Sequence, residues 1–76
     1  MLILYTKDGC QYCVKVKDAF SDRNVTYEER NIKDPQFLKE VQEYGARSLP
    51  LMVDTSANTT LAESDEIIDY ASEYSF

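Results

Sequence analysis

The chain has 76 residues, of which 43% are hydrophobic and 29% are charged. This length and apolar content suffice for a single small domain with a thin core, so residues 1–76 are expected to form one domain. The net charge of −6 argues against nucleic acid or an anionic membrane as a partner. No apolar run is long enough to cross a membrane, and Met1–Tyr5 is too short and lacks the basic flank of a signal peptide, so a cytoplasmic monomer is expected.

The first half of the chain predicts a strand, a helix and a second strand. Leu2–Thr6 is a short apolar run before a polar loop, which is typical of a buried strand. Residues 11–23 predict an amphipathic helix that ends near Asn24, because three residues recur on one face. These are Cys13, Val16 and Phe20. Residues 25–32 are rich in residues that suit a strand and are expected to pair beside the first strand.

The second half predicts a helix, a hairpin and a last helix. Asp34-Pro35 is a cap followed by proline at the first helical position, and Gly45 is expected to end this second helix. Its inward residues are predicted to be Phe37, Val41 and Tyr44. Two apolar runs, residues 49–53 and 59–62, are separated by a polar turn and predict a hairpin. Ser64 is expected to cap the last helix. The inward stripe of that helix is predicted to be Ile67, Ala71 and Tyr74.

The order βαβαββα indicates the class of fold. A strand, a helix and a parallel strand imply a right-handed crossover, and the hairpin adds two further strands. The sequence therefore predicts an α/β fold with a mixed four-stranded sheet flanked by helices.

Cys10 and Cys13 are the two cysteines of the chain, and they lie at the start of the first predicted helix. Sulfurs at this spacing can close a small disulfide ring, so the pair can cycle between dithiol and disulfide without unfolding the protein. A purely structural disulfide over so short a loop would stabilise little, because the effect grows with the logarithm of loop length. The pair therefore predicts electron transfer through thiols.

Metal binding within one chain is disfavoured. A structural zinc site needs four ligands, whereas the chain has two Cys and no His. A metal or an iron–sulfur cluster shared between two chains stays open as an alternative. No metal is otherwise expected.

Three motifs resemble those of a known family. Tyr5-Thr6-Lys7 followed by Cys10-Gln11-Tyr12-Cys13 is similar to the active-site segment of dithiol glutaredoxins, with Gln11 where proline is common. Residues 45–50, Gly-Ala-Arg-Ser-Leu-Pro, are similar to the family's Gly-x-Arg-Thr-Val-Pro. Ser64-Asp65 matches the end of its Gly-Gly-(Cys/Ser)-Asp segment. The motifs occur in the family's order, and the resemblance implies a thioredoxin-like (glutaredoxin) fold.

The resemblance also implies the roles of the residues. Cys10 would be the nucleophile, since the positive end of the helix dipole favours its thiolate. Cys13 would attack the mixed disulfide on Cys10 and release the product. The Leu49-Pro50 peptide bond is expected to be cis. Glutathione, the expected reductant and co-substrate, would contact seven residues: Lys7, Tyr12, Arg47, Leu49, Pro50, Ser64 and Asp65. The implied substrates are protein disulfides and glutathione mixed disulfides, with ribonucleotide reductase as a protein partner.

The glutathione pattern is incomplete in this chain. Ala62 and Glu63 replace the two glycines of the family segment, which adds a negative charge beside an anionic ligand. Phe37 is expected at the position on the second helix that often carries Gln or Arg for the glycyl carboxylate. An alternative is therefore a glutaredoxin-like redoxin that is reduced by thioredoxin reductase and donates electrons to ribonucleotide reductase. A second alternative is an iron–sulfur cluster-binding module. Thioredoxin itself is disfavoured, because the chain has no Trp.

Overall fold

The protein folds into four strands and three helices in the predicted order, βαβαββα. This computed structural model describes residues 1–73. The elements are β1 Leu2–Thr6, α1 Gln11–Asp22, β2 Tyr27–Asn31, α2 Pro35–Glu43, β3 Leu51–Asp54, β4 Thr59–Leu61 and α3 Ser64–Ser72. The strand order in the sheet is β2-β1-β3-β4. Because β1 pairs in parallel with β2 and antiparallel with β3, the predicted mixed sheet is confirmed.

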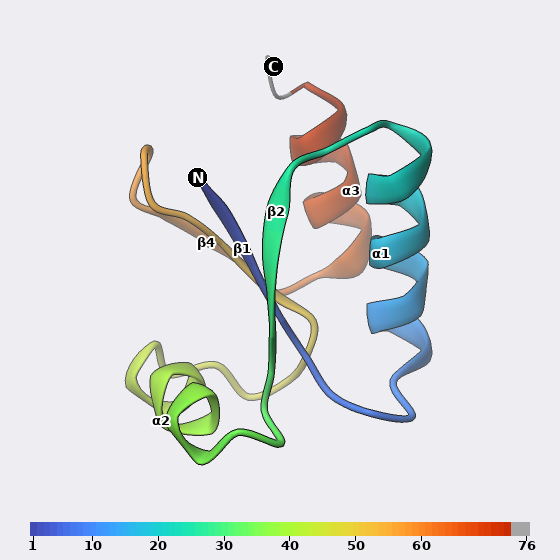
Figure 1. The fold of residues 1–76 in the computed structure, drawn as a ribbon. Coiled ribbons are helices and arrows are strands. Elements are labelled where there is room, and N and C mark those ends of the chain that lie inside the picture. Colours follow the sequence, from blue (N-terminus) through green and yellow to red (C-terminus); the bar gives the residue numbers. More distant parts are fainter. Residues whose placement is uncertain (74–76) are drawn as a thin grey trace.

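The helices cover both faces of the sheet. Figure 1 shows α1 and α3 side by side on one face and α2 on the other. Alternation along β1 sends Leu2 and Leu4 toward α1 and α3, and Ile3 and Tyr5 toward α2. The core therefore has two layers, and β1 contributes to both of them.

The helices largely follow the predicted faces and ends. The three predicted inward residues of α1, Cys13, Val16 and Phe20, are all buried. Ile67 and Ala71 of α3 are also buried, whereas Tyr74 lies outside the described residues. On α2, Val41 is buried and Phe37 is half-buried. Tyr44 is 49% exposed, so its predicted inward position is wrong. The reason is that α2 ends at Glu43, and the chain turns away at Gly45 with a φ of 72°.

Several boundaries differ from the prediction by one or two residues, and the starts of α3 and β2 are the informative cases. The N-cap of α3 is Glu63, and Ser64 is already the first helical residue. Ser64 therefore stands one position too far along the chain to act as the cap, and the cap side chain makes no hydrogen bond. β2 begins at Tyr27, because the Val25 amide is used by the turn after α1, where it donates to the Phe20 carbonyl at 2.9 Å.

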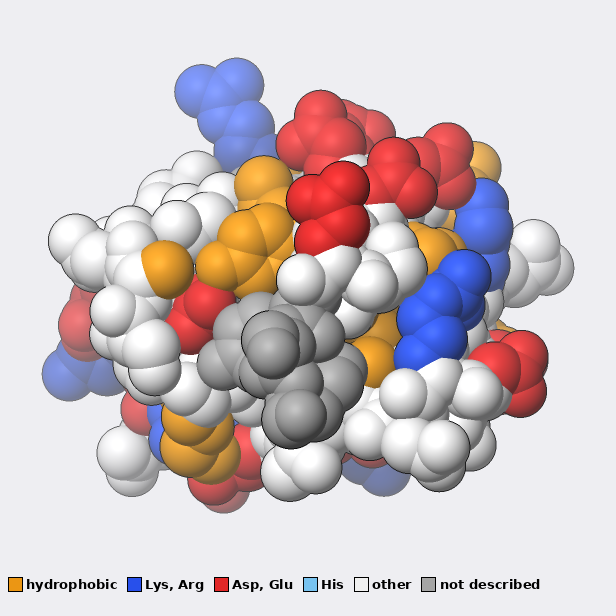
Figure 2. Space-filling view, turned by 90° about the horizontal axis from the view of Figure 1, so that it is seen from above, with side chains coloured by type: hydrophobic (Ala, Val, Ile, Leu, Met, Phe, Trp, Pro, Cys, Tyr) orange, Lys and Arg blue, Asp and Glu red, His pale blue; other side chains and the backbone are white. Residues whose placement is uncertain are grey.

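A buried carboxylate lies at the end of the sheet that is remote from the β1–α1 loop. Asp54 is 2% exposed and accepts hydrogen bonds from the Tyr70 hydroxyl and, at 3.0 Å, from the Ser56 amide. The bond from Tyr70 is the main reason that the pKa of Asp54 lies below its ordinary value. Figure 2 looks onto this end of the molecule, where acidic side chains gather along one edge.

Candidate active site

Cys10 and Cys13 lie where the β1–α1 loop enters the helix, as the sequence predicts. Cys10 is the N-cap of α1, and Cys13 lies in its first turn. Their sulfurs are joined in a disulfide, and their Cα atoms are 5.2 Å apart. Cys10 is 8% exposed and Cys13 is 1% exposed. The site therefore holds a reversible redox pair whose first cysteine is the more accessible one.

The helix N-terminus stabilises negative charge on the first sulfur. The Cys13 amide donates to the Cys10 Sγ at 3.1 Å. Free N–H groups and the helix dipole both favour an anion at this end of a helix. In the dithiol form these groups favour the thiolate of Cys10, which is the species that attacks a disulfide.

A second segment of chain lies against the pair. The Leu49–Pro50 bond is cis, as predicted, and Pro50 is buried. The Leu49 carbonyl oxygen is 3.8 Å from the Cys10 Sγ. An extended substrate beside Leu49 would thus lie next to the reactive sulfur.

Five of the seven residues expected to bind glutathione line a single hollow between α1 and α3. They are Tyr12, Leu49, Pro50, Ser64 and Asp65. This Asp65 hollow has a volume of about 400 Å³. Glu63 also lines it, so the carboxylate that departs from the family pattern faces the same space.

Lys15 pairs with Asp65 across this hollow and was not expected from the sequence. Its Nζ is 2.8 Å from the Asp65 Oδ1, and this bond raises the pKa of Lys15. Both side chains are more than half exposed, so the pair is screened by water. The sequence carries no signal for it, since the two residues meet only when α1 packs on α3.

The other two expected residues, Lys7 and Arg47, lie on the α2 side of Leu49. With Leu49 they line a separate Arg47 hollow of about 260 Å³. Phe37 lies on α2, as expected, but is not among the residues that line this hollow, so its family position stays a prediction. α2 instead contributes three residues, Leu38, Val41 and Gln42.

Phe37 lies about one helical turn before Val41 on α2. The ring of Phe37 lies 5.4 Å from the Arg30 guanidinium.

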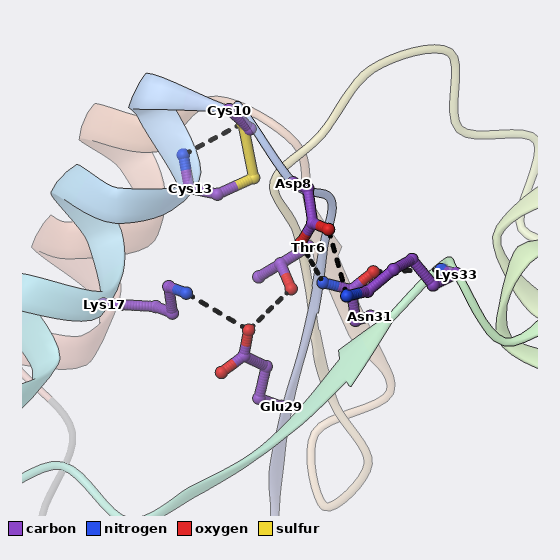
Figure 3. A network of polar contacts seen from close by, with 8 residues as sticks. All are labelled: Thr6, Asp8, Cys10, Cys13, Lys17, Glu29, Asn31 and Lys33. Atoms are coloured by element: carbon purple, nitrogen blue, oxygen red, sulfur yellow. Dashed lines mark hydrogen bonds and ion pairs between the residues drawn. A yellow bond between two sulfur atoms is a disulfide. The ribbon is translucent and has the colours of Figure 1, made fainter.

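A polar network anchors the loop below the disulfide (Figure 3). The buried Thr6 hydroxyl donates to Glu29 at 2.8 Å, and Lys17 pairs with the same carboxylate at 3.2 Å. Asp8 pairs with Lys33 at 3.0 Å and accepts from Asn31 at 3.1 Å. The bond from Lys33 is the main cause of the lowered pKa of Asp8. These contacts join α1 and the end of β1 to β2, and they join the loop before Cys10 to Asn31 and Lys33. The sequence did not reveal them.

Metal-ligand clusters and membrane-spanning helices are both absent from residues 1–73. There is no group of three or more His, Cys, Asp or Glu side chains placed to hold a metal ion in this part of the chain. None of its helices is both long and apolar enough to cross a bilayer.

Comparisons with known proteins agree with the site. A family model described as Glutaredoxin matches residues 2–54. The glutaredoxin-like protein NrdH of Lactococcus lactis subsp. lactis (strain IL1403) is 34% identical over 53 residues, which cover 68% of this chain and 74% of that protein. The protein of the same name from Lactococcus lactis subsp. cremoris (strain MG1363) matches with the same identity and coverage.

Solved structures share the fold. A mutant form of the thioredoxin-like protein BC3987 superposes with a TM-score of 0.83 at 25% identity, over 96% of this chain and 100% of that one. The glutaredoxin-like NrdH-redoxin from Escherichia coli superposes with a TM-score of 0.75 at 23% identity, over 87% and 88% of the two chains. The chain therefore belongs to the glutaredoxin family, and it is a thiol-disulfide oxidoreductase with a thioredoxin-like fold.

Proposed function

We propose that the protein is a redoxin of the NrdH kind, which takes electrons from thioredoxin reductase rather than from glutathione and passes them to a protein disulfide. The disulfide of ribonucleotide reductase is the candidate substrate. The observation that carries this proposal is the 34% identity to the NrdH proteins of Lactococcus lactis over most of the chain. The sequence motifs favour glutathione as the electron donor, whereas this identity favours thioredoxin reductase.

The Asp65 hollow supports this choice. By resemblance to glutaredoxins, Asp65 would meet the ammonium of glutathione, but here Lys15 pairs with it at 2.8 Å. Glu63 adds a second carboxylate to the lining, where it would repel the neighbouring carboxylate of the tripeptide. Each effect is modest in water, and both oppose glutathione.

The reaction follows from the different positions of the two sulfurs. After the reductase has supplied two electrons and two protons to the disulfide, the Cys10 thiolate attacks a sulfur of the substrate disulfide. A Cys10–substrate bond forms, and the other substrate sulfur leaves as a thiolate. The Cys13 thiolate then attacks the Cys10 sulfur, the second substrate sulfur leaves, and the Cys10–Cys13 bond is restored.

Glutathione-dependent turnover remains the second candidate, because one observation favours it. Tyr12, Pro50, Ser64 and Asp65 come together around one hollow, as the glutaredoxin resemblance implies. A glutathione mixed disulfide would enter the same cycle at Cys10.

NADPH consumption during reduction of a protein disulfide separates the two candidates. One assay contains a bacterial thioredoxin reductase, and the other contains glutathione with glutathione reductase. We expect turnover in the first assay and none above background in the second. Turnover confined to the glutathione assay would contradict the proposal. Cys10→Ser serves as the inactive control in both.

A paired substitution tests why glutathione is disfavoured. Replacing Ala62 and Glu63 together by glycine restores the family segment and removes one carboxylate. We expect this variant to gain turnover of a glutathione mixed disulfide, whereas Glu66→Gln, which removes an exposed carboxylate from α3 outside the hollow, should gain none. No gain in the glycine variant would show that these two residues do not disfavour glutathione.

A further inference from the structure

A third hollow lies beside Cys10, between the β1–α1 loop, α1 and the end of β2. It has a volume of about 510 Å³. We call it the Val14 hollow, after the α1 residue that lines it together with Gly9, Cys10 and Lys17. Cys10 itself lines this hollow, whereas the two hollows described above meet the site at Leu49. A partner segment that reaches the reactive sulfur therefore borders the Val14 hollow.

The surface of the Val14 hollow is mainly apolar. Val14 is 50% exposed, although it is a branched aliphatic residue on a helix. Lys17 also lines the hollow, and its methylene stem adds apolar surface behind the charged group. Gly9 contributes backbone without a side chain, which leaves the space beside Cys10 open. An aliphatic side chain that entered here would lose contact with water on several sides.

Two of the three charged residues that line the hollow are paired with groups outside it. Lys17 pairs with Glu29 at 3.2 Å, and Asp8 pairs with Lys33 at 3.0 Å (Figure 3). The third is Lys7, which has no ion-pair partner within residues 1–73. Burying a charge is costly unless the charge is paired. Because the Lys17 and Asp8 charges already have partners, an apolar side chain can cover this surface without leaving them uncompensated.

The spacing of side chains along an extended partner decides which one reaches the hollow. Successive side chains of an extended segment point to opposite faces, so residues two positions apart point the same way and lie about 7 Å apart. When the cysteine of such a segment points at Cys10, the side chains two positions before and after it face the same surface of the protein. One of these two can enter the Val14 hollow.

We propose that the Val14 hollow binds an aliphatic side chain of the protein substrate, two positions from the cysteine that reacts with Cys10. That side chain packs against Val14 and the stem of Lys17, and Val14 is a specificity-determining residue. This inference deepens the proposed function, on which it rests. It names the substrate class of the same site as protein disulfides that carry a large aliphatic residue at this spacing.

The test uses short peptides whose cysteine carries a 2-thiopyridyl disulfide. Reduced protein is mixed with peptide in the absence of any reductase. The Cys10 thiolate attacks the peptide sulfur, a Cys10–peptide disulfide forms, and 2-thiopyridone leaves and is measured by its absorbance. Each rate is divided by the rate of the same peptide with β-mercaptoethanol, which removes differences in the intrinsic reactivity of the peptides.

Three peptides differ at the position two residues from the cysteine, which carries Leu, Asn or Glu, and the series is made on each side of the cysteine. Leu and Asn have similar shapes but different polarity. In one series we expect Leu to react about fivefold faster than Asn, since about half of a leucine side chain becomes buried. Glu should also react more slowly than Leu. A leucine directly beside the cysteine should give no advantage, because it points to the opposite face.

Variants locate the effect in the hollow. Val14→Asp should abolish the Leu-to-Asn rate ratio, and Val14→Thr, which replaces one methyl group by a hydroxyl, should roughly halve it. The ratio cancels any change in the general reactivity of Cys10. Leu38→Asn is the matched control, because Leu38 is a 38% exposed aliphatic residue that lines the Arg47 hollow instead. It should leave the ratio unchanged.

The outcomes separate this inference from the proposed function. Equal normalised rates for Leu and Asn in both series would overturn the aliphatic site. A ratio that survives in Val14→Asp, or that is lost in Leu38→Asn, would overturn it as well. A Glu peptide faster than the Leu peptide would show that Lys7 selects the substrate rather than Val14. None of these results bears on the electron donor, because no reductase is present, and dependence on thioredoxin reductase is decided by the separate NADPH assay.

Discussion

At the residue scale, the two cysteines differ in ways that assign them different steps. Cys10 caps α1 and is the more exposed, whereas Cys13 is almost fully buried one turn into the helix. The amide of Cys13 donates to the Cys10 sulfur, so the first sulfur is the better stabilised anion. We therefore assign the initial attack to Cys10 and the resolving step to Cys13.

Single serine substitutions test this assignment. Reduced Cys13→Ser should form a covalent mixed disulfide with a protein substrate and accumulate it, because no second thiolate is present to release it. Cys10→Ser should form none. Mass spectrometry under non-reducing conditions measures both adducts. An adduct on Cys13 in the Cys10→Ser protein, at a rate similar to that of the other variant, would reverse the roles.

Asp54 is expected to contribute to stability through its charge. Asp54→Asn keeps the shape of the side chain but weakens the bonds from the Tyr70 hydroxyl and the Ser56 amide. We expect the free energy of unfolding at neutral pH to fall by about 1–2 kcal/mol, as measured by urea unfolding. Asp18→Asn, at an exposed position of α1, should change it by less than about 0.5 kcal/mol.

The pH dependence of this effect has a definite sign. Hydrogen bonding lowers the pKa of Asp54 in the folded state below its ordinary value of 3.8. The stabilisation is therefore fully present above that value and is lost as the pH falls through the folded-state pKa. The difference between wild type and Asp54→Asn should shrink in acid. A difference that is constant from neutral pH into strong acid would exclude this account.

At the element scale, α2 is held to the sheet by one polar cluster in addition to its apolar contacts. Glu40 accepts from the Tyr5 hydroxyl at 2.7 Å and from the Arg30 guanidinium at 2.8 Å. The bond from Tyr5 is the main cause of the lowered pKa of Glu40, and burial raises the pKa of Tyr5 to about 12. The helix is thus tied to both β1 and β2.

Removing the charge at this point should loosen α2 alone. In Glu40→Gln we expect amide hydrogens of α2 to exchange several-fold faster, with little change in α1 and α3, because those helices pack on the other face. Hydrogen exchange followed by mass spectrometry or NMR measures this. Glu43→Gln, an exposed position on the same helix, is the control. Equal acceleration in all three helices would mean that Glu40 supports the whole fold rather than this element.

Local sequence patterns were sufficient to predict most elements but few of the contacts between them. The periodicity of α1 and the Asp34-Pro35 start of α2 depend on neighbouring residues, and both are confirmed. The inward position expected for Tyr44 failed because α2 ends at Glu43 and the chain turns away at Gly45. The Lys15–Asp65 pair joins residues 50 positions apart, and local patterns carry no information about such contacts.

At the scale of the whole molecule, charge is distributed unevenly around the active site. The chain is acidic overall, yet the two cations beside Leu49 on the α2 side have no carboxylate partner within residues 1–73, whereas the hollow on the α3 side is acidic. Net charge alone would predict a preference for basic partners. Beside Leu49 the charge is distributed differently, with two cations on the α2 side and more acids than bases on the α3 side.

The most direct test of the central claim is reduction of the Cys10–Cys13 disulfide itself. Oxidised protein is incubated with NADPH and a catalytic amount of a bacterial thioredoxin reductase, quenched in acid, alkylated and weighed by mass spectrometry. We expect two alkyl groups to be added rapidly, and much more slowly when glutathione, glutathione reductase and NADPH replace the thioredoxin reductase system. A disulfide that persists with thioredoxin reductase but is reduced promptly by the glutathione system would contradict this claim.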